Sequence, residues 1–300
     1  MTDIFQKLMK IFDENVSLLR VKESGNHAYT IPDAELNQCL QIIFDTLSEE
    51  CISFTLNRTK AEKTTIIVYE QDQINNLILY HQSNSNELLK KKYCKRIIPV
   101  VGQDGVGKTT LIDSLVLSTN KKSQYYRFKK LFRKSFIYHV SYRYLNKKLS
   151  KIYGKKIEKN DFDDYYGIFI IFTSLLRYPL LMLRTFFVHK MILSDRYFHD
   201  YILKNISFED KKIVLRDRWT LLLKIIPNTY WFLQLDAPSD IILARKQEMS
   251  KYDIDMYRQL IFKLYLHKPS VVYTYINTKN ELSECKNILK HEAENSGLLK

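Results

Sequence analysis

One segment of the sequence restricts the fold more than any other. An apolar run at Ile97–Val101 leads directly into Gly102–Thr110, which reads GQDGVGKTT, and an apolar helical pattern follows from Leu111. This order satisfies the pattern G-x-x-x-x-G-K-[ST] in the strand, loop and helix context that the motif requires. Because Pro99 cannot donate a backbone hydrogen bond, we expect it at the start of the strand or at an irregularity.

The residue types of this loop suit phosphate binding. Glycine has no Cβ and accepts positive φ, so a glycine-rich loop can bring backbone N–H groups close to phosphate oxygens. The following helix N-terminus adds partial positive charge, Lys108 can reach the β and γ phosphates, and Thr109 can bind Mg²⁺. We therefore predict a nucleotide-binding loop made of Gly102, Gln103, Asp104, Gly105, Val106, Gly107, Lys108, Thr109 and Thr110.

Length and composition exclude several classes of protein. The chain has 300 residues, of which 45% are hydrophobic and 27% charged, so we expect a conventional core and exclude a disordered chain. Its four cysteines lie far apart without a C-x-x-C pair, which indicates neither a disulfide framework nor a zinc ribbon and fits a reducing compartment. The N-terminus shows no pattern of a secretory signal. A formal net charge of +14 favours anionic partners.

Composition shifts along the chain predict two domains. A polar run at 81–86 and a lysine-rich run at 90–92 separate an N-terminal part from the segment that carries the loop. We predict a small α+β domain at 1–84, a linker at 85–95 and an α/β domain at 96–300. Within the first domain the patterns predict helices at 4–19 and 34–47 and strands at 52–56 and 64–69.

A second strand downstream ends in charged residues. Met191–Ser194 is apolar and runs into Asp195 and Arg196. Ligands of open parallel sheets bind at the carboxyl ends of the strands, so Asp195 would emerge beside the phosphate loop and could hold Mg²⁺, while Arg196 would face the transferred phosphate. An ordinary surface ion pair is the alternative explanation of these two residues.

A third strand pattern, Tyr230–Leu235, ends at Asp236, and Pro238 then suits the first turn of a helix that carries Arg245. Ser250 with Asp253 is predicted to cap a last amphipathic helix that reaches residue 265.

The order of these motifs resembles the thymidylate kinases. The resemblance covers roughly 96–294 and rests on the Gly-x-Asp-Gly-x-Gly-Lys-Thr-Thr loop, the strand ending Asp195-Arg196-Tyr197, the strand ending at Asp236, and Arg245 nine residues further on. The segments 195–201 and 244–248 look closer to the divergent branch associated with bacterial surface-polysaccharide and lipopolysaccharide synthesis.

The resemblance implies a doubly wound parallel sheet, ATP as phosphoryl donor, Mg²⁺, and a mobile lid that starts near Arg245. It implies that Asp104 lies near the acceptor, that Asp195 and Arg196 act on metal and phosphate, and that Arg245 borders adenine. Catalytic roles are therefore assigned to Lys108, Asp104, Asp195, Arg196 and Arg245, and metal binding to Thr109 and Asp195.

The chain departs from the family where the acceptor binds. Val101 stands where those kinases commonly have Glu, and neither the Arg-Glu-Pro segment after the second strand nor the Arg-x-Gln-His pattern occurs. In that region residues 121–156 carry thirteen Lys or Arg residues, no acidic residue and interleaved aromatic rings. They form either an anion-binding or membrane-contacting surface, or a solvated basic face behind a buried aromatic stripe at Phe128, Phe132 and Phe136.

The longest apolar stretch, Ile168–Val188, contains Arg177, Pro179 and Arg184, so we expect a buried helix rather than a membrane span. Arg177 and Arg184 are two helical turns apart and are candidates for acceptor binding, together with Lys129 and Arg133; an ion pair with the N-terminal domain is the alternative for the first two.

Three functions follow from these patterns. The leading prediction is an ATP-dependent phosphotransferase whose acceptor is a sugar or surface glycan. We expect this protein in the cytoplasm or peripheral to the inner face of the membrane, and a homodimer is one expected form. The alternatives are a dTMP kinase and a non-catalytic, nucleotide-regulated protein that binds nucleic acid or membrane. For the leading function we do not expect nucleic acid as a partner.

Overall fold

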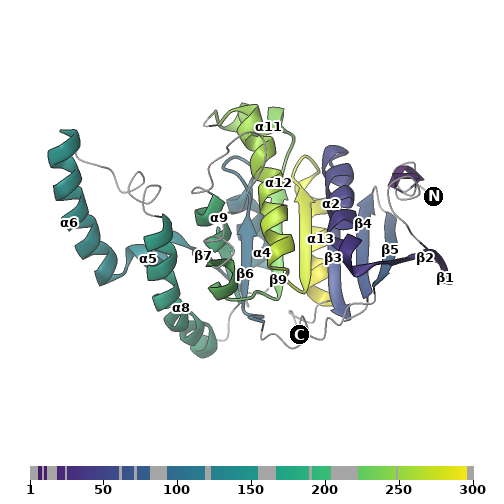
Figure 1. The fold of residues 1–300 in the computed structure, drawn as a ribbon, viewed down its shortest axis with the longest axis horizontal. Helices are drawn as coiled ribbons and strands as arrows, with labels where there is room; N and C mark the ends of the chain where they lie inside the picture. Colours follow the sequence, from purple (N-terminus) through teal and green to yellow (C-terminus); the bar gives the residue numbers. More distant parts are fainter. Residues whose placement is uncertain are drawn as a thin grey trace.

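The computed structural model shows one mixed sheet with helices on both faces (Figure 1). It describes residues 6–8, 10–11, 19–23, 26–60, 63–70, 73–81, 93–118, 123–154, 167–188, 191–203, 222–247 and 249–295. The strands are β1 (Leu19–Glu23), β2 (Asn26–Ile31), β3 (Ser53–Lys60), β4 (Lys63–Glu70), β5 (Gln73–His81), β6 (Ile97–Val101), β7 (Ser123–Arg127), β8 (Met191–Asp195), β9 (Trp231–Asp236) and β10 (Val272–Asn277). The helices are α2 (Asp33–Glu49), α4 (Lys108–Ser118), α5 (Lys129–Arg133), α6 (Phe136–Tyr153), α8 (Gly167–Val188), α9 (Phe198–Leu203), α11 (Ser239–Arg245), α12 (Lys251–His267) and α13 (Leu282–Asn295).

The strand order determines where a ligand can bind. The sheet runs β1-β2-β5-β4-β3-β10-β9-β6-β8-β7, and the strands from β10 to β7 are parallel to one another. The chain leaves β6 toward β7 and β8 on one side and later continues to β9 and β10 on the other. Such a reversal is a topological switch point, outside which ligands bind in open α/β sheets. The predicted α/β fold with a doubly wound parallel sheet is confirmed.

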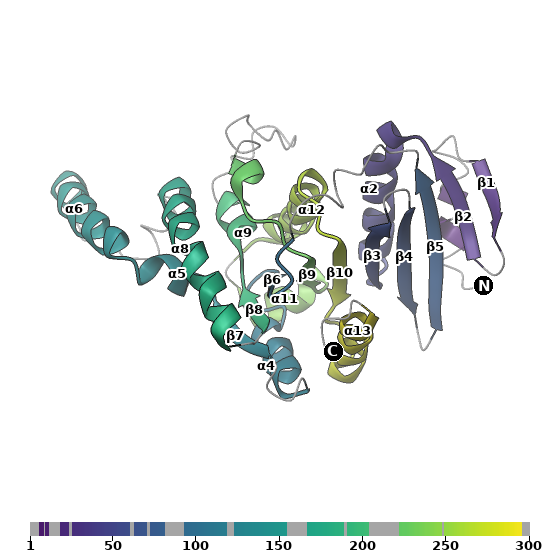
Figure 2. The ribbon, with the colours of Figure 1, turned by 90° about the horizontal axis from the view of Figure 1, so that it is seen from below.

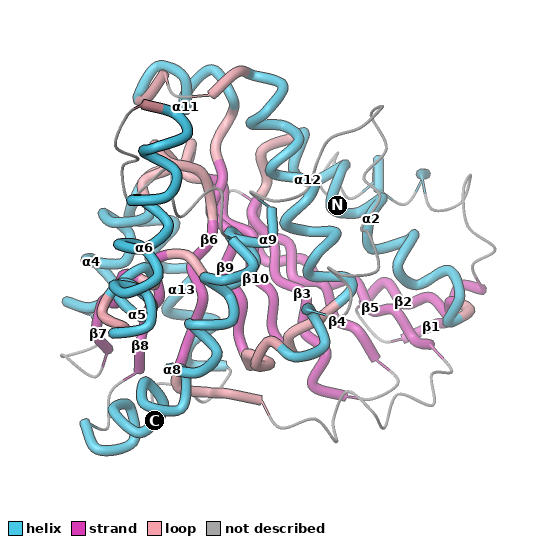
Figure 3. The backbone as a smooth tube through the Cα atoms, turned by 60° about the vertical axis from the view of Figure 1, so that its left-hand side comes forward, coloured by secondary structure: helices cyan, strands magenta, loops and turns pink. Residues whose placement is uncertain are grey.

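Helices cover both faces of the parallel strands (Figures 2 and 3). One apolar cluster joins α4, α11 and α13 to one face and includes Ile112, Ile242 and Leu289. The other cluster joins α2, α5, α8, α9 and α12 to the opposite face. Strands covered on both sides are apolar almost throughout, and every residue of β6 and β9 is buried.

The N-terminal part adds five strands to the same sheet. β3 pairs antiparallel with β10, and Thr55 Oγ1 lies 3.1 Å from Thr274 Oγ1 across this pair. The backbone N–H of Asn277 donates to Ser53 Oγ at 3.1 Å. The domain boundary at residue 84 stays a prediction, and residues 82–92, which include most of the predicted linker, lie outside the described residues.

The N-terminal patterns predicted three elements correctly and missed others. α2, β3 and β4 match the predicted helix and strands. The first predicted helix extends too far, because Leu19 already begins β1; residues 6–8 and 10–11 are helical. β1, β2 and β5 were not predicted, and in β5 the consecutive Asn75 and Asn76 break the apolar alternation by which strands are recognised.

The C-terminal patterns were closer to the structure. Pro238 precedes α11 directly, and Ser250 and Asp253 form the predicted capping box of α12, in which Asp253 N donates to Ser250 Oγ at 3.1 Å. This helix is not the last one, since α13 follows β10.

The end of the molecule beyond β7 consists of α5, α6 and α8 (Figures 1 and 2). Phe128 and Phe132 are buried, as the alternative of an aromatic stripe required, and their rings contact Tyr201. Phe136 is 81% exposed, because the chain turns at Ser135 and α6 starts in a new direction. The predicted aromatic stripe is therefore wrong at its third member.

α8 is buried along one face only. Ile170, Ile171, Tyr178 and Leu181 belong to the core cluster. Its exposed apolar side chains include Phe172, Leu176, Leu180, Leu183 and Phe187. Among the described residues, Phe169–Val188 is the one stretch that is long and apolar enough to cross a membrane, judged by length and composition. The prediction of a buried helix is thus correct for one face and wrong for the other.

α2 and α12 share one aromatic core. The rings of Phe44 and Phe262 stack with centroids 4.1 Å apart and planes at 8°. Phe44 also meets Phe54 and Tyr275 edge-on, at 6.2 and 5.5 Å. Such pairs stabilise a core by about 0.5–1.5 kcal/mol beyond the burial of their area. The N-terminal helix and the C-terminal half of the chain therefore stabilise each other.

Replacing Phe44 by alanine should destabilise both halves together. We expect the free energy of unfolding to fall by about 3–5 kcal/mol, because a fully buried ring is lost. Chemical denaturation followed by circular dichroism should show one shifted transition, and Ile74→Ala at an exposed position of β5 should shift it little. Two transitions, of which only one moves, would contradict this expectation and favour an independent domain at 1–84.

Candidate functional site

The strand before the glycine-rich loop carries Pro99 at its centre. The carbonyl groups of Arg96 and Val100 accept hydrogen bonds from Ile192 of β8 and from Arg196 directly after it, so alternate residues of β6 face β8 and Pro99 faces β9. Pairing with β9 covers only Val100 and Val101. The backbone of Pro99, which has no N–H to donate, therefore lies where β6 is not paired with β9, and this agrees with the predicted irregularity.

The loop depends on glycine at its first position. Gly102, Gly105 and Gly107 have φ values of 149°, 98° and 87°, in the region that L side chains rarely adopt. A Cβ on Gly102 would also collide with the carbonyl oxygen of Leu235 in β9. Glycine at this position lets the loop pass directly over the neighbouring strand at the switch point.

Lys108 begins α4 and lies under the loop. Its side chain is buried, and Nζ donates to the carbonyl groups of Gly102 at 2.8 Å and Gln103 at 2.5 Å. Nζ also lies 3.5 Å from Asp104 Oδ1. Burial lowers the pKa of Lys108 and the charge of Arg196 lowers it further, while nearby carboxylates oppose both effects.

Asp104 is surrounded by three cations. Its carboxylate accepts a hydrogen bond from Arg196 Nη2 at 2.7 Å and lies 3.5 Å from Lys108 Nζ and 3.6 Å from Lys246 Nζ. Burial alone would raise the pKa of Asp104, but Arg196, then Lys108 and Lys246, hold it well below its usual range. The carboxylate therefore stays ionised and balances the cations around the loop.

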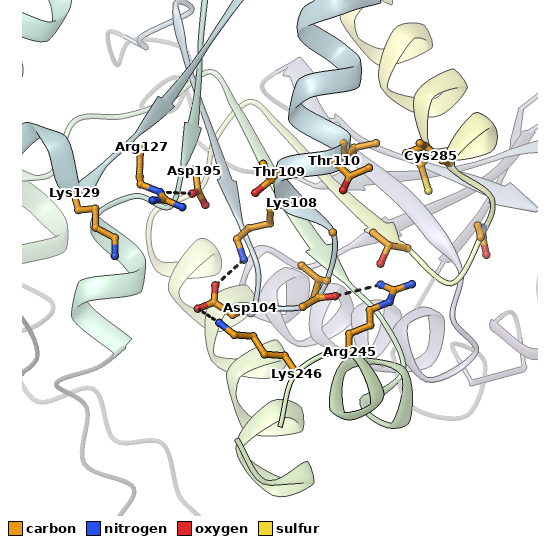
Figure 4. Close-up of a pocket in the computed structure, with 17 residues that line it drawn as sticks. Asp104, Lys108, Thr109, Thr110, Arg127, Lys129, Asp195, Arg245, Lys246 and Cys285 are labelled. Carbon is orange, nitrogen blue, oxygen red and sulfur yellow. Dashed lines mark hydrogen bonds and ion pairs between the residues drawn. The ribbon is translucent and has the colours of Figure 1, made fainter. Parts of the chain in front are cut away.

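A cavity of about 750 Å³ opens beside the loop (Figure 4). Its lining comes from the loop and the start of α4, the ends of β7 and β8, the start of α5, the end of α11, and the loop and helix after β10. The residues are Asp104, Gly105, Val106, Gly107, Lys108, Thr109, Thr110, Leu111, Arg127, Lys129, Asp195, Arg245, Lys246, Thr278, Asn280, Leu282 and Cys285.

Asp195 lies at the carboxyl end of β8, beside the loop, as predicted. Tyr125 donates its hydroxyl to Asp195 Oδ2 at 2.8 Å, and Arg127 Nε lies 3.6 Å from the same oxygen. Both partners belong to β7, in which Arg127 pairs in register with Asp195. The edge strand β7 therefore places the cation Arg127 beside Asp195 at the cavity.

The backbone at Arg196 is in an unusual conformation. Its φ of 70° lies in the left-handed region, which costs a non-glycine residue about 1–3 kcal/mol unless the surroundings hold it. Arg196 N donates to Val100 O at 2.9 Å, and Ser194 Oγ donates to Arg196 O at 3.0 Å. These bonds keep the strand end turned so that the guanidinium reaches the loop.

Buried groups orient the Arg196 side chain. Arg196 Nη1 lies 3.9 Å from Asp200 Oδ1, which accepts the hydroxyl of Tyr257 at 2.6 Å. Burial would lower the pKa of Arg196, but Asp200 and Asp104 raise it above its ordinary value. Burial raises the pKa of Asp200, against the charge of Arg196. The guanidinium is thus held between one buried and one half-exposed carboxylate.

The structure brings most of the predicted residues to this cavity. Arg245 donates from Nη1 to Gly105 O at 3.2 Å, and Lys129 lines the opposite side. Arg196 reaches the site through Asp104 and is not itself among the lining residues, nor are Gly102 and Gln103.

Three of the candidate acceptor residues lie elsewhere. Arg133, Arg177 and Arg184 do not line the cavity. Arg184 and Arg177 lie near Tyr126 of β7. Burial raises the pKa of Tyr126, and the charges of these two arginines oppose that effect. Their role in acceptor binding stays a prediction.

Sequence reasoning missed several groups of the site. Arg127 and Tyr125 belong to β7, a polar edge strand without an apolar run. Lys246 follows Arg245 directly, and its contact with Asp104 depends on how α11 ends. The one available clue was the position of Arg127, which ends its strand as Asp195 ends β8.

The site offers oxygen ligands for a magnesium ion. Thr109 and Asp195 both line the cavity and supply a hydroxyl and a carboxylate, which suit Mg²⁺. Within the described ranges, no group of three or more His, Cys, Asp or Glu side chains could hold a metal. A bound Mg²⁺ would therefore take its other ligands from phosphate oxygens and water.

His199, the histidine next to Asp200, lies in the core and not at the cavity. Its ring stacks on Tyr197 and meets Phe232 edge-on, with centroids 5.9 and 4.9 Å away. Neither ring nitrogen has a hydrogen-bond partner among the residues that the structure describes. Burial, helped by the charge of Lys268, lowers the pKa of His199 to about 3. The ring is therefore neutral and does not reach the cavity.

Comparison with known proteins finds similarity in structure but not in sequence. No protein-family model matches the chain, and no curated protein matches it. Among solved structures it is similar to thymidylate kinase from Candida albicans, with 15% sequence identity and a TM-score of 0.46, over 70% of this chain and 96% of that chain. The function proposed below rests on the residues of the cavity and not on this likeness.

Gly102→Ala should disable the loop. The added methyl meets the carbonyl of Leu235 in a backbone region that costs about 1–3 kcal/mol, so we expect binding of Mg²⁺-ATP to weaken by at least about tenfold. Titration calorimetry measures this. Gly154→Ala is the matched control, because Gly154 also has positive φ but nothing lies within 4 Å of its added Cβ. Equal affinities of the two variants would contradict the assigned geometry.

His199→Leu should change how stability depends on pH. In the folded chain the pKa of His199 is about 3, below the ordinary 6.5. As pH falls from 6.5 toward 3, His199 is therefore protonated in the unfolded chain but stays neutral in the folded chain. The free energy of unfolding should therefore decrease by up to about 1.4 kcal/mol for each pH unit of acidification because of His199. The leucine variant should lack this part of the pH dependence. Urea unfolding across this pH range measures the difference; parallel pH profiles would show that His199 is not buried neutral.

Proposed function

We propose that this protein is an ATP-dependent phosphotransferase of the thymidylate-kinase-like type, with a sugar or surface glycan as acceptor. The observation that carries the proposal is the meeting of the positive-φ glycine loop, Lys108 and Asp195 in one cavity at the switch point of the sheet. A loop that merely holds a nucleotide needs no carboxylate opposite it. Phosphoryl transfer uses one, because a carboxylate there would hold the Mg²⁺ that neutralises charge on the phosphates.

The loop and α4 would bind the phosphates of ATP. The loop residues after Asp104 and the N-terminus of α4 line the cavity, so their backbone N–H groups would bind phosphate oxygens, and Lys108 would exchange the carbonyl groups of Gly102 and Gln103 for such oxygens. Arg245, at the end of α11, and the loop after β10 would flank the nucleoside. ATP would supply the γ-phosphoryl group.

The other charged residues would act on the transferred group. Thr109 and Asp195 would hold Mg²⁺, which neutralises charge on the phosphates when it is bound. Lys108 and Arg196 would stabilise negative charge as it develops, and Asp104 would position the acceptor. Such preorganised charges are worth more in a site from which water is excluded.

Charge supports an anionic glycan as acceptor. Arg127 and Lys129 line the cavity on the side of β7 and α5, next to a segment without acidic residues. A sugar hydroxyl could accept the phosphoryl group while neighbouring acidic or phosphorylated sugars contact these cations. dTMP is the alternative acceptor.

A cytoplasmic location is part of the proposal. All four cysteines, Cys39, Cys51, Cys94 and Cys285, are free thiols. Unpaired cysteines suit a reducing compartment, which is also where ATP is available.

Consumption of ATP by the purified protein tests the proposal. The reaction is run against nucleoside monophosphates, free sugars and phosphorylated glycan cores, and product mapping identifies the acceptor. Lys108→Ala should lower kcat by about 10²–10³-fold, since it removes a charge aimed at the transferred phosphate. Lys290→Ala, on the exposed side of α13 and away from the cavity lining, is the control and should leave kcat unchanged.

Two further variants separate catalysis from binding. Asp195→Asn and Arg196→Ala should reduce turnover more than ATP affinity, because their contacts strengthen as charge develops. Turnover of dTMP alone would replace the glycan by a nucleotide as acceptor. ATP binding without turnover of any acceptor would refute the phosphotransferase and leave a nucleotide-regulated binding protein.

A further inference from the structure

We propose that the end of the molecule formed by α5, α6 and α8 docks on the surface of an anionic lipid membrane, with the exposed face of α8 entering the interface. This inference goes beyond the proposed phosphotransfer and does not depend on it.

Exposed apolar side chains gather at this end. Of the seventeen exposed large hydrophobic residues among those described, eleven belong to α6 and α8. On α8 they occur at Phe172, Leu176, Leu180, Leu183 and Phe187, spaced by three or four residues, so they share one face of the helix. From first to last they extend over about 22 Å of helix. A continuous apolar stripe of this length marks a binding surface.

The same end carries charge of one sign. The described ranges 123–154 and 167–188 contain eleven Lys or Arg residues and no Asp or Glu. Exposed cations include Lys134 on the turn before α6, and Lys147, Lys148 and Lys151 along it. An apolar helix face on an end of the molecule that carries only basic charge is the combination that binds an interface, where the face enters the acyl boundary and the cations contact anionic headgroups.

Packing within the fold indicates that α8 lies on a membrane and does not cross it. Its other face belongs to the core: Tyr197 donates its hydroxyl to that of Tyr178 at 3.3 Å, and Arg96 donates to the carbonyl of Thr185 at 2.8 Å. Half-buried Arg177 and exposed Arg184 would also have to enter the hydrocarbon of a spanning helix. Withdrawing α8 would open the core.

Charge also distinguishes a lipid surface from a second copy of this chain. A two-fold symmetric contact brings the same patch of both copies together. Here it would oppose two sets of cations without any carboxylate from the same segments, which is unfavourable. An anionic bilayer offers an apolar region for the stripe on α8 and anionic headgroups for the exposed cations of this end.

Sedimentation of the full chain with vesicles tests the proposal. We expect binding to vesicles of phosphatidylcholine with phosphatidylglycerol, weaker binding as salt is raised, and little binding to phosphatidylcholine alone. Leu176→Gln with Leu180→Gln should weaken binding by more than about tenfold, since two apolar side chains no longer enter the interface. Ile74→Gln with Leu117→Gln, which changes two exposed apolar residues elsewhere, should bind as the parent does.

A second pair of variants tests the charge independently. Replacing Lys147, Lys148 and Lys151 by Gln should weaken binding to the anionic vesicles by roughly fivefold for each charge near the surface. Lys251, Lys279 and Lys290, which are exposed on other parts of the chain, form the matched control when replaced in the same way. Equal losses in both triple variants would show a general effect of net charge and overturn the assigned surface.

Four other results would also overturn the proposal. The first is absence of binding to anionic vesicles. The second is self-association in light scattering that the Leu176/Leu180 variant abolishes, which would assign the face to a second copy. The third is resistance of bound protein to carbonate extraction, which would indicate a spanning helix. The fourth is a lowered free energy of unfolding in the Leu176/Leu180 variant but not in the Ile74/Leu117 variant, because the chain itself would then cover this face.

Discussion

The arrangement around the glycine-rich loop depends on one carboxylate. Asp104 lies between 2.7 and 3.6 Å from the charged groups of Arg196, Lys108 and Lys246, which come from three separate segments of the chain. Without it, these cations would repel one another across a partly buried site, where charges are screened less than in water. Asp104 thus neutralises part of the charge of a strongly basic site and holds the three cations together.

Local chemistry and tertiary contact differ in how far the sequence predicts them. The loop, Asp195 at its strand end and the cap of α12 follow from residues adjacent in the chain, so their patterns predicted them. Arg127 and Lys246 contribute through contacts with distant residues, which no local pattern contains. The prediction of a buried α8 rested on apolar content alone. Apolar content does not distinguish the face that packs on the core from the face that contacts nothing in the described chain.

The candidate site and the basic apolar end share one short stretch of chain. Arg127 closes β7 and lines the cavity, and Lys129, two residues later, both lines the cavity and begins α5. The cavity and this end of the molecule are therefore directly connected through the turn between β7 and α5.

α12 joins the loop to the N-terminal part of the chain. Gln103 Nε2 donates to Ile254 O at 3.0 Å near the start of this helix, and Phe262 stacks on Phe44 of α2 eight residues later. These two contacts are about 12 Å apart along the helix axis. Both contacts lie on one continuous helix, so Gln103 of the loop and Phe44 of α2 are connected without an intervening loop. The N-terminal part is therefore attached to the glycine-rich loop through a single stiff element.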